Sequence, residues 1–275
     1  MNRMPQVCVA LLALGPILGG CRKPPEAPAQ LDELCKYLYT HLGDEEDDYL
    51  VAGVANLNIW LDNPDNMAAT TEGYLIQNLD QSTVNNLDDE ERDLTDLVGA
   101  AVGNESAFST TEIVNTIVLD DQGQVFPDTY ALYEREWLEP NPGKAPSCFD
   151  DMDEDCMYAE AENHSVANYP LGLQAESWSR AQYRWIETDD GMAMVHRTWM
   201  NEPVILNKDW ISLDHQFYLT VTIPQPSGKA RRLQGMWMVA QLGEDATVPE
   251  SLALSLVISS MQSTSEAIET WMAAQ

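Results

Sequence analysis

The stretch Gln216-Phe217-Tyr218-Leu219-Thr220-Val221-Thr222-Ile223 alternates large apolar side chains with polar or amphipathic ones. Such a period of two predicts a β-strand with one face turned to a core. The turn signal Pro224-Gln225-Pro226-Ser227-Gly228 follows, and the apolar residues of 233–242 predict the strand that returns beside it. The stretch therefore predicts an antiparallel hairpin.

A second hairpin precedes this one in the chain. Residues 182–186 and 192–200 flank Thr188-Asp189-Asp190-Gly191, and an Asp-Gly pair between two strand-like runs is a strong hairpin signal. Residues 130–138 alternate as well, and the β-branched run 113–119 predicts one more strand. Together these segments predict an antiparallel meander.

Helical periodicity marks the N-terminal part of the chain. The leucines of 31–42 share one helical face, and a second helix is predicted from the acidic run 44–48 to Leu61. A third helix is predicted from the acidic run 88–91 to a cap at Gly103-Asn104. Residues 67–79 fit a helix or a strand.

A long helix closes the chain. Thr247 and Glu250 have the spacing of a capping box, and an apolar stripe follows at Leu254, Val257, Ile258, Met261, Ile268 and Trp271. The order of helices, antiparallel strands and one C-terminal helix predicts an α+β fold. This order resembles the helix-grip (START-like) architecture, which implies a curved sheet holding the C-terminal helix, often with a hydrophobic ligand between them. A generic layered sandwich is the alternative.

The N-terminus has the features of an export signal. A basic start is followed by an apolar run from Val7, which is too short to span a bilayer and closes at Leu18-Gly19-Gly20-Cys21. These last four residues resemble the lipobox of bacterial lipoproteins. The resemblance implies cleavage before Cys21 and acylation of Cys21, and Arg22 favours the outer membrane. An ordinary cleaved signal with a chance cysteine is the alternative.

These features predict three segments. Residues 1–20 form a lipoprotein signal peptide, residues 21–30 a proline-rich tether, and residues 31–275 a single α+β domain. We therefore expect the protein in the bacterial cell envelope, held to a membrane through lipid on Cys21.

The charge of the chain limits its partners. Asp and Glu number 45 against 14 Lys and Arg, a formal net charge of −31. A surface of this sign repels DNA and RNA, so nucleic acid is excluded as a partner. The charge favours solubility and the binding of cations, including divalent metal, and adaptation to a saline or calcium-rich exterior is the alternative explanation.

Three cysteines remain after Cys21. Cys148 and Cys156 enclose a short polar loop, and export implies an oxidising compartment, so we expect a disulfide between them. Cys35 lies on the leucine face of the first helix and is expected to be a buried free thiol. Its pairing with either of the other two stays open.

The loop between the two cysteines carries a candidate calcium site. Asp151, Asp153 and Asp155 have the D-x-D-x-D spacing of oxygen ligands for Ca²⁺. Glu162 stands twelfth from Asp151, the place of the bidentate glutamate in an EF-hand, but Cys156 replaces the glycine at the sixth place. The loop predicts weak Ca²⁺ binding, with a chance pattern in so acidic a chain as the alternative.

Motifs of catalysis do not stand out in the sequence. It contains no H-E-x-x-H pair, no G-x-S-x-G elbow and no glycine-rich phosphate loop. We predict a non-catalytic envelope lipoprotein that binds a hydrophobic or carbohydrate ligand or an envelope protein. The strand-half tryptophans, Trp178, Trp185, Trp199, Trp210 and Trp237, either line a ligand face or fill a core. The competing hypothesis is an exported hydrolase using His196, His215 and Asp214.

Overall fold

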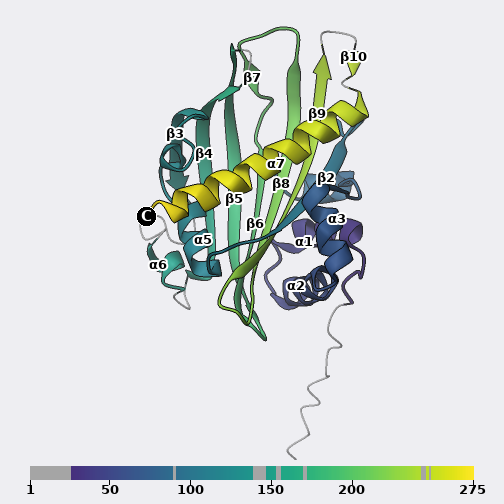
Figure 1. Cartoon of the computed structure of the whole chain (residues 1–275). Coiled ribbons are helices and arrows are strands. Elements are labelled where there is room, and N and C mark those ends of the chain that lie inside the picture. The colour runs from purple at the N-terminus through teal and green to yellow at the C-terminus, as the bar shows by residue number, and fades with distance from the viewer. Residues whose placement is uncertain are drawn as a thin grey trace, which may run out of the picture.

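The computed structural model describes residues 26–88, 91–138, 147–152, 156–169, 172–242, 246–247 and 249–275. Their strands form one antiparallel sheet in the order β1-β2-β9-β8-β6-β5-β4-β3, shown in Figure 1. Two short strands lie off this path, where β10 pairs with β9 and β7 pairs with β5. The predicted α+β class and the antiparallel meander are thereby confirmed.

Both predicted hairpins lie in the sheet. β8 (Ser212–Pro224) pairs with β9 (Ala230–Leu242), which sets Phe217 opposite Trp237 and Thr220 opposite Gln234. β5 (Leu173–Thr188) pairs with β6 (Gly191–Met200) across the Asp-Asp turn. β6 and β8 are also neighbours, so these four strands form the continuous middle of the sheet.

Other strands extend the sheet on both sides. β2 (Val98–Glu105) pairs with β9, and the short β1 (Tyr74–Leu75) pairs with β2. β4 (Tyr158–Tyr169) pairs with β5, and β3 (Tyr130–Trp137) pairs with β4 at the far end. The two-residue strands are β7 (Ile205–Leu206) and β10 (Ala246–Thr247).

One side of the sheet, called here the outer face, is covered by the N-terminal helices. These are α1 (Leu31–His41), α2 (Asp48–Leu61), α3 (Pro64–Glu72) and α4 (Gln81–Asn85). The leucine face of α1 packs with the odd-numbered residues of β6, β8 and β9, including Trp237. Cys35 lies in this layer as a buried free thiol. Side chains alternate along a strand, so the even-numbered residues of these strands face the other way.

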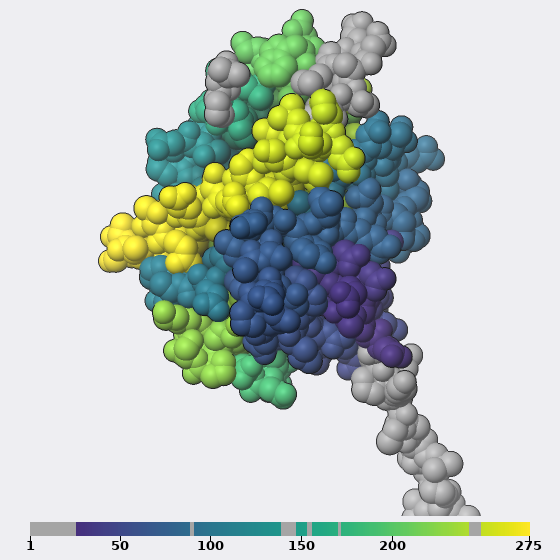
Figure 2. Space-filling model, turned by 45° about the vertical axis from the view of Figure 1, so that its right-hand side comes forward, coloured from purple at the N-terminus to yellow at the C-terminus, as the bar shows by residue number. Residues whose placement is uncertain are grey.

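The other side, called here the inner face, is covered by α5 (Thr110–Ile117), α6 (Ser147–Asp150) and α7 (Glu250–Ala273). α7 crosses the sheet as a diagonal rod (Figure 1) and forms a ridge on the molecular surface in Figure 2. Two apolar clusters lie under it, one around Met236, Met238 and Met261, the other around Ile268 and Met272. Within the described ranges, none of the helices combines the length and apolarity needed to cross a membrane.

Three local predictions were wrong. Residues 113–119 lie largely in α5 and not in a strand, because Ser109 and Glu112 form a complete capping box and the helix buries Ile113, Val114 and Ile117. Residues 98–105 form β2 and not the end of an acidic helix, because they pair with β9 along their whole length. α7 starts after Pro249, whose ring cannot form a side-chain cap, so the predicted capping box is absent.

The contact between β2 and β9 gives a stability test. Gly99 lies opposite Trp237, and a Cβ on Gly99 would stand 2.6 Å from Trp237 Nε1. The indole is buried and donates to Gln77 O at 2.9 Å, so it has little room to move. Gly99→Ala is expected to lower the free energy of unfolding by about 1–3 kcal/mol in urea titrations. Gly235→Ala is the control, because its Cβ meets nothing closer than 3.5 Å; equal effects of the two would contradict the steric argument.

Candidate functional site

The inner face carries a row of polar side chains across the middle of the sheet. Strand register places Tyr183, His196, Thr220 and Gln234 side by side on β5, β6, β8 and β9. All four side chains are buried, although a sheet face beneath a helix is ordinarily apolar. The row therefore marks the inner face as the place to look for a binding site.

His196 is the centre of this row. Its ring stacks on Tyr183 at 4.3 Å between centroids and meets the edge of Tyr218 at 6.5 Å. Neither ring nitrogen has a hydrogen-bond partner, and the residue is 7% exposed. Burial, together with the positive charges of Arg135 and Arg232, lowers the pKa of His196 to about 3. His196 is therefore neutral at physiological pH and offers one donor and one acceptor to a partner inside the protein.

A hydrogen-bond chain beside His196 fastens α7 to the sheet. Tyr218 Oη donates to Gln234 Oε1, and Gln234 Nε2 donates to Ser265 Oγ on α7. Ser265 Oγ in turn donates to Asn104 Oδ1 on β2 at 3.2 Å. Burial raises the pKa of Tyr218 to about 12, so its hydroxyl stays protonated and able to donate. Since this chain ties β8, β9 and β2 to one helix, it sets where α7 crosses the sheet.

Arg232 is the most unusual residue of the inner face. It lies two residues before Gln234 on β9, is 1% exposed, and has no hydrogen-bond partner at Nε or Nη1. Among the described residues, no carboxylate forms an ion pair with it. Thr222 lies opposite on β8 and has an unpartnered, buried hydroxyl. A buried cation without a partner costs several kcal/mol, and such costs are typical of binding sites.

Arg135, on the same face, has hydrogen-bond partners at all three of its side-chain nitrogens. Its Nη1 donates to Ile117 O at 3.1 Å and to Leu119 O at 2.9 Å. Its Nε donates to Asn163 Oδ1 at 2.9 Å and its Nη2 to Tyr133 Oη at 2.6 Å. Arg135 thus holds the end of α5 against β3 and β4, whereas Arg232 holds no such partners.

The acids of the sheet lie almost entirely on its outer face. The carboxylates of β3 to β5 that pair across strands lie on the outer face, where His164 contacts Glu134 and Glu176, and Arg180 contacts Glu160 and Glu162. Apart from Glu187, exposed beside the β5–β6 turn, the charged strand residues of the inner face are Arg135 and Arg232. In a chain with three times more acids than bases, the inner face is cationic and aromatic.

Tyrosines from distant strands converge on this face. Tyr130 and Tyr133 of β3 are 5.1 Å apart between centroids, and Tyr169 of β4 and Tyr218 of β8 are close enough to help raise the pKa of Tyr130, after burial itself. Three strands separate β3 from β8, about 19 Å across a flat sheet. The long side chains of Tyr130 and Tyr218 therefore lean toward each other across the inner face. Tyr169 is 47% exposed, so this aromatic margin reaches solvent.

The structure separates the residues of the predicted hydrolase site. His196 lies on the inner face, whereas His215 lies on the outer face beside Phe217, with Asp214 at an irregularity of β8. Burial is the main cause of the lowered pKa of His215, and Arg92 adds to it. A sheet layer lies between the two histidines, so they cannot act on one substrate atom.

The structure describes only part of the predicted calcium site. Asp153 and Asp155 lie outside the described residues. Glu162 lies on the outer face of β4 and bonds Arg180 at 3.0 Å, whereas Asp151 lies beside α6 near Asp150. Among the residues that are described, no group of three or more candidate ligands surrounds a metal position. Calcium binding by this loop stays a prediction.

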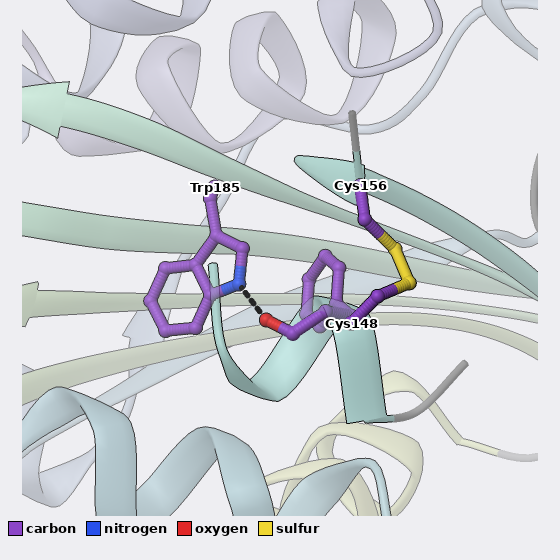
Figure 3. Close-up of a disulfide and its surroundings, with 4 residues drawn as sticks. Cys148, Cys156 and Trp185 are labelled. Atoms are coloured by element: carbon purple, nitrogen blue, oxygen red, sulfur yellow. Dashed lines mark hydrogen bonds between the residues drawn. A yellow bond between two sulfur atoms is a disulfide. The ribbon is translucent and has the colours of Figure 1, made fainter. Parts of the chain in front are cut away.

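The disulfide and three of the strand-half tryptophans belong to the core, whereas Trp210 is 47% exposed. Cys148 and Cys156 are placed for the predicted disulfide, which closes the segment after α6 next to Trp185 (Figure 3). The Trp185 indole donates to Phe149 O at 2.8 Å. Trp185, Trp199 and Trp237 are each at most 2% exposed, so they fill the two layers and do not form a stacking platform.

Sequence reasoning did not single out Arg232. A signal was available: the alternation that sends Leu233 and Trp237 to one face sends Arg232, Gln234 and Met236 to the other. The sequence did not reveal that a helix covers that second face.

Comparison with known proteins gives no family. No family model and no curated protein matches the sequence. Partly similar structures include a STAR-related lipid transfer protein from Xanthomonas axonopodis (13% identity, 66% of this chain and 96% of that one, TM-score 0.40). They also include a START superfamily protein from Mycobacterium smegmatis (10%, 64% and 97%, 0.40) and human STARD10 (5%, 72% and 81%, 0.42). These belong to the group whose element order the sequence resembles, and at these TM-scores they assign neither family nor ligand to the chain.

Arg232 and Arg135 form a matched pair for a stability test. Arg232→Met is expected to raise the free energy of unfolding by about 1–4 kcal/mol, because it removes a buried, unpaired charge. Arg135→Met is expected to lower the free energy of unfolding by about 1–3 kcal/mol, because two backbone carbonyls and an amide oxygen lose their hydrogen-bond donor. Denaturant titration of both variants measures the difference. A loss of stability in Arg232→Met would show that Arg232 is a structural residue.

His196 predicts a pH dependence of stability. The pKa of His196 is lower in the folded than in the unfolded state. Its contribution to the free energy of unfolding is therefore complete above pH 6.5 and is lost as pH falls toward about 3. The loss approaches 1.4 kcal/mol per pH unit in this window. His196→Phe keeps the stacking and is expected to flatten the curve. His164, whose pKa is raised by Glu176, is the control: His164→Gln should steepen the acid loss. A His196→Phe curve parallel to wild type would contradict the prediction.

Proposed function

We propose that the protein is a lipid-anchored, non-catalytic binding protein of the bacterial cell envelope, which holds a hydrophobic or amphipathic ligand between the inner face of its sheet and α7. The observation that carries the proposal is the pair His196 and Arg232. Both are buried on the inner face, and the two ring nitrogens of His196 and Nε and Nη1 of Arg232 have no hydrogen-bond partner. A ligand with polar groups would satisfy them.

The surroundings of this pair suit an amphipathic molecule. Methionines at 194, 200, 236, 238 and 261 lie on or against the inner face, and methionine side chains adapt their shape to irregular apolar partners. The tyrosines at 130, 133, 169 and 218 add rings with a polar tip. Apolar contact and polar anchoring are therefore available side by side.

Catalysis receives no support from these groups. A general base needs a proton to take within hydrogen-bond reach, and no carboxylate of the described residues orients His196. With His215 on the opposite face, the hydrolase hypothesis has no observation in its favour. We infer that the ligand is bound and not converted.

Attachment to the membrane completes the proposal. Cys21 lies outside the described residues, and its acylation is inferred from the lipobox resemblance. Helix α1 starts at Leu31, so a semi-extended tether of about 3 Å per residue would keep the folded body within roughly 30 Å of the bilayer. The outer membrane is the proposed location.

One preparation tests both parts of this proposal. Each variant is purified from whole host cells after growth with radiolabelled palmitate, and native mass spectrometry follows. We expect label in the wild type, none in Cys21→Ser, and a retained ligand that Arg232→Met lacks. Unlabelled wild-type protein would refute the anchor, and wild-type protein without any ligand or partner would refute the binding function.

A further inference from the structure

Arg232 has a single acidic neighbour on the helix that covers it. The carboxylate of Glu269, on the last turns of α7, is close enough to act on the Arg232 guanidinium, yet the two form no ion pair. Glu269 Oε2 accepts from Ala107 N at 3.3 Å, and Oε1 is buried without a partner. Glu269 thus lies near a cation that it does not bind.

The unpartnered hydrogen-bond donors around Arg232 suit an acidic group of a ligand. Arg232 presents unpartnered Nε and Nη1, and Thr222 on the next strand presents an unpartnered hydroxyl. The planar fork of an arginine fits the two oxygens of a carboxylate or phosphate, and a hydroxyl can donate to a third position. Both residues are more than nine-tenths buried, so an anion there would be held out of water.

A third feature widens the set of unpartnered polar atoms. Phe108 O accepts from Ala230 N, which draws the segment before α5 against the start of β9. Thr110 follows this segment, is 5% exposed, and also has a hydroxyl without a partner. Unpartnered polar groups therefore come from the sheet and from two of the helices that cover its inner face, α5 and α7.

We propose that Arg232 and Thr222 bind the acidic group of an anionic amphiphile. The Glu269 carboxylate lies next to this position, so the bound acid and the packed end of α7 exclude each other. The inference rests on the proposed binding function and names the chemical class of its ligand. The ligand has one carboxylate or phosphate and an apolar body that lies along the methionines and tyrosines.

Competition follows from the charges. A ligand acid at Arg232 would stand beside the Glu269 carboxylate, and two like charges near one cation repel each other. Binding therefore pushes the last turns of α7 outward, breaking the contacts of Ile268 and Met272 with the inner cluster. The Ser265 hydrogen bonds, one to two turns earlier on α7, can hold the rest of the helix in place. Since Arg232 is covered in the closed form, this movement is also the route of access.

The test uses the full exported chain carrying Cys21→Ser, so that no attached acyl chain competes. Calorimetric titrations use decanoate, decyl phosphate and decanol, which share one tail length and differ in the head, and inorganic phosphate alone. We expect both acids to bind more tightly than decanol. Arg232→Met should remove this preference. Glu269→Gln should tighten both acids roughly tenfold and leave decanol unchanged. Glu266→Gln, an exposed acid on the same helix, is the matched control and should change nothing.

The outcomes separate the two proposals. Decanol binding as tightly as the acids, with no effect of Glu269→Gln, would overturn the acid site and leave the binding function standing. Failure of every probe, together with ligand-free protein from the host, would overturn both. A tighter fit of decyl phosphate than decanoate would assign a phosphate headgroup, and the reverse a fatty acid. Inorganic phosphate binding as tightly as decyl phosphate would overturn the amphiphile in favour of a free anion.

Hydrogen exchange gives a second readout that does not depend on affinity. Bound decanoate should speed exchange in the last turns of α7 while the turn at Ser265 stays protected. Slower exchange throughout α7 would contradict the competition between acid and helix.

Discussion

The central strands pack against a different helical layer on each of their two faces. β6, β8 and β9 bury their odd-numbered residues against the N-terminal helices and their even-numbered residues against α5 and α7. Because the side-chain period of a strand is two, a slip of one residue would send Trp237 beneath α7 and Arg232 into the leucine layer. The register of these strands therefore decides both the core and the site.

This constraint explains how far the sequence could lead. Segments with one clear period, such as 31–42, 182–200, 216–242 and the closing helix, were predicted correctly because burial and local pattern agree. The run 113–119 misled because its β-branched residues also fit one face of a helix once Ser109 and Glu112 cap it. β4 went unpredicted, since its Ala, Glu, Asn and Ser residues have little β-propensity and form a strand by pairing with β3 and β5.

The candidate site was only partly accessible to such reasoning. His196 could be noted as a titratable residue among strand residues, but its isolation from His215 depends on which face each one occupies. Arg232 was overlooked because an arginine in a strand is ordinarily solvated. Its significance arises from a helix that is adjacent in space and distant in sequence. The near absence of acids from the strands of the inner face likewise becomes visible only when the faces are known.

The two ends of the sheet have a bearing on self-association. β1 contributes only two residues at one end, and β3 at the other carries Glu134 and Glu136 toward solvent. A second copy approaching the open margin of β3 would meet a strand bearing the same acids, and a margin of two residues offers almost nothing to pair with. Edge strands that are short or carry like charges resist pairing with the edge strand of a second copy. Such edges keep a protein present at high local concentration from assembling into fibres.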